Sequence, residues 1–372
     1  MKFSIIITVT NPSKSMNALE SALTQNYHDY EIIYSNNSGN DCREIIKKFK
    51  SKKIKYYEPK KYLRIVDHWN FAFSKASGEW QILLCDDDAL MFNTLGKLNK
   101  IIEKNYGYEI FIWDYGFYKK GLSDNSFHIQ KEKVNSTKII ESQKILDLLH
   151  KQAALNGKVK LNCPFFPRAV FSKKIISQIE KKIGFLFLPP DPMTSSAVAG
   201  LKLTKKFLKI NETFTILDVN EGDNAASHII NNVTFKRMHR NIKIKYSPIK
   251  TMHNFPSTNL ESLIRVEKKL GQFDKKTINF SNFFFSSYLQ IQEMISNRIL
   301  HKKVLNKFNE DFDKQVYSIK FRFFVKILFL KISKLKLFNF LLNFFFKPIE
   351  MQTISFDKKS NINFLSKSIY KK

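Results

Sequence analysis

The sequence has few cysteines, and the three it contains lie far apart. Cys42, Cys85 and Cys163 form neither a close metal-binding pair nor a disulfide framework, so we expect a protein of a reducing compartment such as the cytoplasm. We also expect no secretory leader, because MKFSIIITVTNPSKS has a single lysine before a short apolar run that ends without a small-residue cleavage site. This stretch predicts a first β-strand instead.

Acidic residues are scarce beside basic ones. The 372-residue chain has 33 Asp and Glu against 62 Lys and Arg, a formal net charge of +29. Such an excess predicts a polyanionic partner, which could be nucleic acid, a nucleotide, a phospholipid or a phosphorylated glycolipid. Hydrophobic residues make up 43% of the chain and aromatic residues 14%, so the chain can build a core and is not of the disordered class.

The first hundred residues alternate between β-type and helical patterns. Strands are expected at 3–10, 30–35, 53–58 and 79–85, and helices at 15–25, with Ser15 as a cap, at 42–50 and at 65–78, with Gly78 as a C-cap. Short loops between them predict an α/β fold with a largely parallel sheet. Polar pairs follow the first two strands, at Thr10-Asn11 and Asn36-Asn37. In a parallel sheet such loops share one edge, where ligands bind.

Three adjacent carboxylates end the fourth expected strand, in ILLCDDDAL at 82–90. Asp86, Asp87 and Asp88 repel one another unless a cation joins them, and carboxylate oxygens are ligands that Mg²⁺ and Mn²⁺ prefer. The alternative is a polar turn that caps the strand and opens a helix. The position after a buried strand, beside two polar loops, favours the cation site.

These motifs together resemble the family 2 nucleotide-sugar glycosyltransferases, which have the GT-A fold. The resemblance is carried by the first strand with its Thr10-Asn11 turn, ALESALTQNYHDYEII (18–33), SNNSGND (35–41), WNFAFSKASGEW (69–80) and LLCDDDAL (83–90). It covers residues 1–95 well and 160–227 weakly. It implies a GT-A domain at 1–227, with a nucleotide half at 1–95 and an acceptor half at 96–227. Beyond about residue 228 the alternation stops, and the sequence predicts a mainly helical, basic region at 228–372.

The resemblance also implies roles for individual residues. Nucleotide binding falls to Thr10, Asn11, Asn36, Asn37, Asn70, Asp86 and Asp87. Asp88, with Asp86, would hold a Mn²⁺ or Mg²⁺ ion that bridges the two phosphates of the donor and neutralises the leaving group. The family usually has an acidic residue where this chain has Asn36, and an amide both donates and accepts hydrogen bonds, so the base bound is left open.

Inverting transfer, which the resemblance implies, needs a carboxylate that takes the proton of the acceptor hydroxyl. In the family this base lies near a helix start roughly a hundred residues after the acidic motif. Asp191, in FLFLPPDPMTSSAVAGL at 185–201, is the first candidate, and an N-terminal helix cap is its alternative role. Asp218, Glu221 and Asp223 are weaker candidates.

The second half of the chain lacks an uninterrupted apolar run of about 20 residues, so we expect no transmembrane helix. Lysines interrupt residues 317–350, the most apolar segment. On a helix its apolar side chains form one stripe: Phe321, Phe324, Leu328, Ile332 and Leu335. A basic amphipathic helix of this kind fits an anionic bilayer surface, and packing on the catalytic domain is the alternative.

The expected function is an inverting, metal-dependent transfer from a UDP- or GDP-sugar to a glycan or glycolipid acceptor of a bacterial surface (lipooligosaccharide, capsule or a lipid-linked glycan). The enzyme would work at the cytoplasmic face of the inner membrane, on its anionic surface and without a nucleic-acid partner. A sugar nucleotidyltransferase is one alternative, although TVTNPSKS lacks the glycine-rich phosphate loop of such enzymes. A nucleic-acid-binding protein is another, although no basic-aromatic platform or reading helix is evident.

Overall fold

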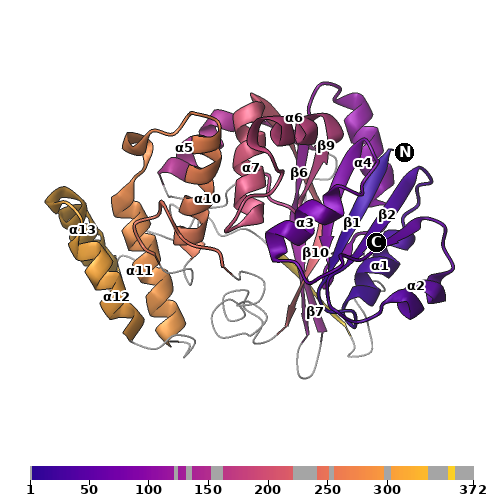
Figure 1. Ribbon diagram of the computed structural model, residues 1–372, viewed down its shortest axis with the longest axis horizontal. Helices are drawn as coiled ribbons and strands as arrows, with labels where there is room; N and C mark the ends of the chain where they lie inside the picture. Colours follow the sequence, from indigo (N-terminus) through magenta and orange to yellow (C-terminus); the bar gives the residue numbers. More distant parts are fainter. Residues whose placement is uncertain are drawn as a thin grey trace.

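The computed structural model describes residues 2–120, 125–130, 136–151, 162–220, 241–250, 255–296, 303–333 and 351–356. The expected α/β fold is confirmed. One large sheet has helices on both faces, and a further group of helices extends away from it (Figure 1).

The first part of the sheet follows the predicted alternation. Its elements are β1 (Phe3–Val9), α1 (Ser15–Leu23), β2 (Tyr30–Asn36), α2 (Arg43–Phe49), β3 (Ile54–Tyr57), α3 (Ile65–Phe73), β4 (Trp80–Cys85), β5 (Ala89–Leu90) and α4 (Thr94–Lys104). Strands β3, β2, β1 and β4 pair in parallel in this order. Val9 pairs with Asn36 and Thr8 with Cys85, so the carboxyl ends of three strands meet at one edge.

The second part of the sheet contains most of the antiparallel pairs. It comprises β6 (Ile110–Lys120), β7 (Asn125–Gln130), β8 (Thr137–Glu141), α5 (Ser142–His150), β9 (Ala169–Ser172), α6 (Lys173–Ile183), α7 (Pro192–Leu203) and β10 (Lys206–Asn220). Strand β9 lies antiparallel between β4 and β6, while β10 runs parallel to β6. The parallel arrangement predicted from the first hundred residues therefore holds for β1 to β4, and the strands added later follow another pattern.

The region after the sheet is mainly helical, as predicted. It contains α10 (Phe255–Lys269), a short 3-10 turn (Lys275–Thr277), α11 (Phe280–Ser296), α12 (Lys303–Asp313) and α13 (Tyr317–Ser333). Strand β11 (Met351–Phe356) was not predicted, and it returns to the sheet beside β7. Among the described helices, none combines the length and the apolar character needed to cross a bilayer.

Two apolar cores hold the helices on the sheet. On one face, α1 and α4 pack through residues such as Leu19 and Leu98. On the other face, α3 packs through Val66, Trp69 and Phe73, together with α5, α6 and α7. In Figure 1, α1 and α2 accordingly lie on the side of the sheet opposite to α7.

Two predicted helix boundaries were wrong. Helix α3 ends at Phe73 instead of reaching Gly78. Gly78 lies where the turn before β4 passes close to the backbone of β1. A Cβ atom at this position would lie 2.7 Å from the backbone of Phe3 and Ser4, so only glycine fits. The residue that precedes α1 is Lys14, so Ser15 is not the cap. Its hydroxyl donates to the Pro12 carbonyl and lies 2.7 Å from the Tyr34 hydroxyl.

Candidate active site

The loop after β1 is held by a carboxylate from the end of β4. Asp86 Oδ2 accepts hydrogen bonds from the backbone amides of Thr10 and Asn11, both at 2.7 Å, and from the Thr10 hydroxyl at 3.1 Å. The two loops meet because β1 and β4 are adjacent parallel strands. The structure thus brings together three residues that the sequence had assigned to one edge.

The acidic residues of this edge differ in their surroundings. Burial raises the pKa of Asp86, which is 8% exposed, while its bonds from Asn11 and Thr10 and the nearby charge of Lys14 act in the opposite direction. Asp87 is more exposed, and its carboxylate lies 4.0 Å from the Lys14 ammonium. Asp88 is 5% exposed and its amide donates to the Cys85 carbonyl, which closes a turn. The polar turn of the alternative interpretation is therefore present, but strand β5 follows it instead of the helix that this interpretation expected.

The thiol of Cys85 lies beside the same three carboxylates. Burial raises its pKa well above the usual value, and the charges of Asp88, Asp87 and Asp86 raise it further. The thiol therefore stays protonated at neutral pH. A cation bound at this edge would reduce the electrostatic repulsion among the carboxylates of Asp86, Asp87 and Asp88.

The donor set of this edge fits a hard divalent cation in type. Every side-chain ligand that Asp86 and Asp88 offer is a carboxylate oxygen. Asp86 Oδ2 accepts three hydrogen bonds, and the Asp88 carboxylate is hydrogen-bonded with the Cys85 thiol. Over the described residues, no group of three or more His, Cys, Asp or Glu side chains is placed to hold a metal. An ion here would take its other ligands from water and substrate phosphates, as Mg²⁺ often does.

The loop after β2 is organised by two asparagines. Asn36 accepts from the amide and hydroxyl of Ser38 and donates to the Asn40 carbonyl and the Tyr56 hydroxyl. It is fully buried, so it shapes the loop from within. Its predicted contact with a nucleotide base stays a prediction.

Asn37 connects this loop to its neighbours. Its side chain donates to the Leu63 carbonyl and accepts from the Leu63 amide, each at 2.9 Å. Its backbone amide donates to the Val9 carbonyl at 2.8 Å. The loops after β1 and β2 and the segment before α3 are thereby tied to one another.

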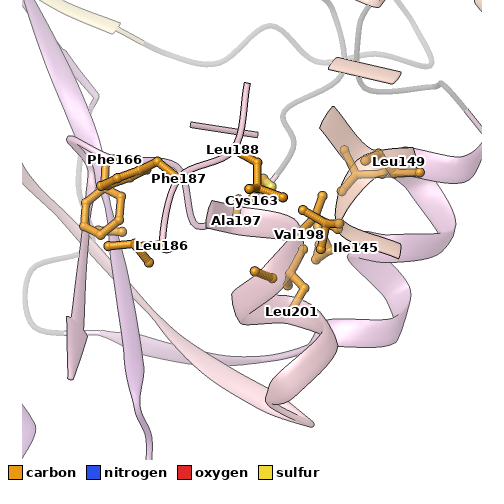
Figure 2. Close-up of a cluster of buried hydrophobic side chains, with 14 of the residues drawn as sticks. Ile145, Leu149, Cys163, Phe166, Leu186, Phe187, Leu188, Ala197, Val198 and Leu201 are labelled. Carbon is orange, nitrogen blue, oxygen red and sulfur yellow. The ribbon is translucent and has the colours of Figure 1, made fainter. Parts of the chain in front are cut away.

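Asn70 of α3 links the sheet edge to the segment before α7. Its amide donates to the Phe187 carbonyl at 2.9 Å, and its carbonyl oxygen accepts from the Phe187 amide at 3.1 Å. Trp69 packs edge-on against the Phe187 ring and is a core residue. Figure 2 shows Phe187 beside Phe166, with Leu188 above Ala197 of α7. These contacts give Asn70 a structural role, and its assignment to nucleotide binding stays a prediction.

Asp191 is the N-cap of α7. Its carboxylate accepts from the Met193 amide at 3.0 Å and from the Thr194 hydroxyl at 2.6 Å. Burial raises the pKa of Asp191, and the bonds from Thr194 and Met193 oppose this rise. Asp191 therefore fills the capping role that was its alternative, and its raised pKa also suits a general base. Its place at a helix start is as predicted.

The weaker base candidates fall at the end of β10 and just after it. Glu221 and Asp223 lie outside the described residues, as does the side chain of Asp218, whose backbone belongs to β10. Of the stripe expected at residues 317–350, Ile332 and Leu335 likewise have no described side chains.

Sequence reasoning missed a cationic cavity whose lining includes Pro189, two residues before Asp191. It has a volume of about 420 Å³ and is lined by Pro189 and by four basic side chains, Arg64, Lys243, Lys245 and Arg265, together with Asn241, Ile242 and Ile244. The sequence signal that could have indicated this cavity is the alternation of isoleucine and lysine at 242–245, in which the isoleucines are buried and the lysines exposed. This alternation does not indicate which part of the chain the lysines face.

Comparison with known proteins gives three likenesses. Residues 4–179 match the family model described as Glycosyl transferase family 2. The uncharacterized glycosyltransferase MG060 homolog of Mycoplasma pneumoniae is 30% identical over 128 residues, which are 31% of this chain and 41% of that protein. The match thus spans less than half of this curated relative.

The third likeness is to solved structures. The crystal structure of S. aureus TarS 1–349 in complex with UDP-GlcNAc is 12% identical, with a TM-score of 0.48 over 77% of this chain and 82% of that chain. The crystal structure of S. aureus TarS is also 12% identical, with a TM-score of 0.48 over 79% of this chain and 53% of that chain.

Proposed function

Residues 4–179 form a glycosyltransferase domain of family 2, and from this premise we propose that the chain transfers a sugar from a nucleoside-diphosphate donor to a hydroxyl of a glycan or glycolipid acceptor. The observation that best supports this proposal is that Asp86, after β4, accepts hydrogen bonds from the loop after β1, with Asp88 two residues further along the chain. This edge lies at the carboxyl ends of parallel strands, where α/β proteins bind nucleotides.

On the donor side, the β1 and β2 loops receive the nucleoside and Asp88 faces the diphosphate. Asp86 keeps the Thr10 and Asn11 amides in place, so it shapes the nucleotide site as much as it contacts it. A Mn²⁺ or Mg²⁺ ion held by Asp88, with Asp86 beside it, would neutralise the charge that develops on the leaving diphosphate. Asp87 and Lys14, at the outer rim, orient the same phosphates.

On the acceptor side, Asp191 takes the proton of the attacking hydroxyl. Its partial burial weakens the solvation of its charged form, which makes it a stronger base than an exposed aspartate. The bonds from Thr194 and Met193 fix the direction of its carboxylate. Attack from the face opposite to the leaving diphosphate inverts the sugar configuration.

The test is a donor screen with the full chain. Hydrolysis of UDP- and GDP-sugars is measured with Mn²⁺ for the wild type, for Asp88→Asn and for Asp313→Asn, whose side chain is 74% exposed on α12. Asp88→Asn keeps the shape of the side chain and removes its charge. We expect it to lose at least about 100-fold in rate, since metal-assisted charge stabilisation contributes several kcal/mol. Full activity of Asp88→Asn would remove the metal assignment, and no turnover by the wild type would remove the function.

We further propose that the enzyme works at an anionic membrane surface on the cytoplasmic side, docked through α13. Phe321, Phe324 and Leu328 are each more than half exposed, whereas Phe323 is buried against Phe312. The described part of the predicted stripe is thus exposed, while the other side of α13 packs on α11 and α12 through Phe323. Helix α13 lies at the end of the molecule remote from α2 (Figure 1). The net charge of +29 favours an anionic bilayer as the occupant of this face.

A further inference from the structure

The cationic cavity is a built site that the proposed function does not use. A fully buried carboxylate, Glu261 of α10, accepts hydrogen bonds from the backbone amides of Lys245, Tyr246 and Ser247, at 2.6–2.9 Å. The Arg265 guanidinium donates to Glu261 at 2.8 Å and to the Lys243 carbonyl at 2.7 Å. The segment that carries the two lysines is therefore fixed on α10 by charge-assisted bonds.

Two residues that line the cavity, Arg64 and Pro189, belong to segments that also carry residues of the proposed reaction centre or are tied to them. Arg64 directly follows Leu63, which Asn37 ties to the loop after β2. Pro189 lies two residues before Asp191, whose amide donates to Ser262 of α10 at 3.0 Å. The segment that carries the proposed base and the helix that carries Arg265 therefore both contribute to the cavity or to its support.

The charges around the cavity are not balanced. Asp67 pairs with Arg64 at 2.6 Å and Glu261 pairs with Arg265, which offsets two of the four basic side chains. For Lys243 and Lys245 no carboxylate partner is found among the described residues. The Lys245 ammonium lies 5.3 Å from the centre of the Tyr246 ring. Two uncompensated ammonium groups in a cavity of this volume suit a phosphate group joined to a small organic moiety.

On the premise of the glycosyl transfer proposed above, we propose that this cavity binds a phosphate group of the acceptor. The acceptor is then a phosphorylated glycan, a phosphorylated polyol or a lipid-linked glycan phosphate, and its phosphate sets which hydroxyl reaches Asp191. The two guanidinium groups orient the phosphate, and Lys243 and Lys245 supply most of its charge stabilisation.

The experiment uses the full chain and measures the binding of inorganic phosphate and of glucose 1-phosphate by calorimetry, with Mn²⁺, first without nucleotide and then with saturating UDP or GDP. Lys243→Gln with Lys245→Gln is compared with Lys181→Gln with Lys182→Gln, which removes the same charge from exposed positions on α6. We expect the first pair to weaken binding about tenfold per lysine, since hydrogen bonds to charged groups contribute about that much. The α6 pair should change it less than twofold.

Three outcomes overturn the proposal. Equal phosphate affinity in both double variants means that the lysines do not form the site. Displacement of phosphate by the nucleotide means that the cavity belongs to the donor. Lysine-dependent binding of phosphatidylglycerol vesicles without binding of glucose 1-phosphate assigns the lysines to a lipid headgroup instead of an acceptor. Failure of the proposed function looks different, because then no nucleotide binds to any variant while phosphate binding can still depend on Lys243 and Lys245.

Discussion

The backbone amides of Thr10 and Asn11 both lie 2.7 Å from Oδ2 of Asp86, so one carboxylate at the end of β4 sets the path of the chain after β1. These strands are adjacent in the sheet but 75 residues apart in sequence. The acidic motif therefore has a structural task in addition to any role in metal binding.

Replacing Asp86 by alanine should release the loop after β1. Hydrogen bonds to a buried charged group contribute about 1.5–3 kcal/mol, so we expect a loss of that order in the free energy of unfolding. Hydrogen exchange of the Thr10 and Asn11 amides should become faster in the folded protein. Asp87→Ala is the control, because its carboxylate is partly exposed at 4.0 Å from Lys14. Unchanged exchange at Thr10 and Asn11 in Asp86→Ala would show that the loop is held by other contacts.

Replacing Asp191 by asparagine separates its two roles. Asparagine caps helices as well as aspartate does, so α7 and the stability of the protein should be preserved. Asparagine cannot accept a proton, so the rate of transfer should fall by about 100-fold to 10,000-fold while donor binding is kept. Stopped-time transfer assays and nucleotide titrations measure the two quantities. Equal loss of donor affinity and stability would indicate a structural role alone.

The pH dependence of transfer gives an independent test of Asp191. Burial raises its pKa above the usual 3.8, and the hydrogen bond from the Thr194 hydroxyl lowers it by stabilising the charged form. Thr194→Val removes that bond, so the pKa should rise further. The acidic limb of the kcat/KM profile should then move to higher pH, because a larger fraction of Asp191 is protonated. A limb that stays in place in Thr194→Val would assign it to another group.

Whether a structural feature could be predicted from the sequence depends on how far apart in the chain the residues that determine it lie. Strand β4 and its carboxylates were predictable, because the periodicity is local and parallel strands bring their carboxyl ends together. The start of helix α7 was predictable from Asp191 and the proline after it, which are local signals of a helix N-terminus. Strand β11 was not predicted, because its partner β7 lies more than 200 residues earlier in the chain. The pairing is set by neither segment alone.

The assignments of Gly78, Asn36 and Asn70 show the same limit. Gly78 lies in a turn after a helical pattern, which resembles a helix end, yet its contact with Phe3 and Ser4 is what requires glycine. Asn36 and Asn70 were assigned from the order of motifs to the nucleotide, and in the structure their amides bond to Asn40 and Phe187. A polar residue after a strand is visible in sequence, whereas the group it faces is a property of the fold.

Glu31 should make the protein sensitive to acid. This carboxylate of β2 is buried and accepts hydrogen bonds from Ser4 at 2.6 Å and from Ser77, and it pairs with Lys55 at 2.6 Å. Burial raises its pKa, but the bonds from Lys55, Ser4 and Ser77 outweigh burial and lower it from 4.5 to about 2.

The sign of the effect follows from this direction. Because the folded pKa lies below the unfolded value, the stabilisation by Glu31 is present above pH 4.5 and is lost as the pH falls towards 2. Glu31→Gln should reduce the free energy of unfolding at pH 7 by about 1–3 kcal/mol and flatten its decline below pH 4.5. Urea unfolding at several pH values measures both. Glu44→Gln, with its side chain 78% exposed, is the control. A parallel decline in Glu31→Gln and wild type would contradict the assignment.

The exposed face of α13 predicts how the chain binds bilayers. Replacing Phe321, Phe324 and Leu328 by serine should weaken binding to phosphatidylglycerol vesicles by at least tenfold, because each inserted side chain contributes up to about 1.5–3 kcal/mol. The matched control replaces Tyr106 and Phe185, which are 98% and 59% exposed in other parts of the molecule. Vesicle flotation at low and high salt separates the apolar contribution from that of the lysines, since salt screens only the latter. If the α13 variant and the control float equally well with the vesicles, the membrane contact lies on another surface. If neither the wild type nor any variant binds the vesicles, this bilayer is not a partner of the chain.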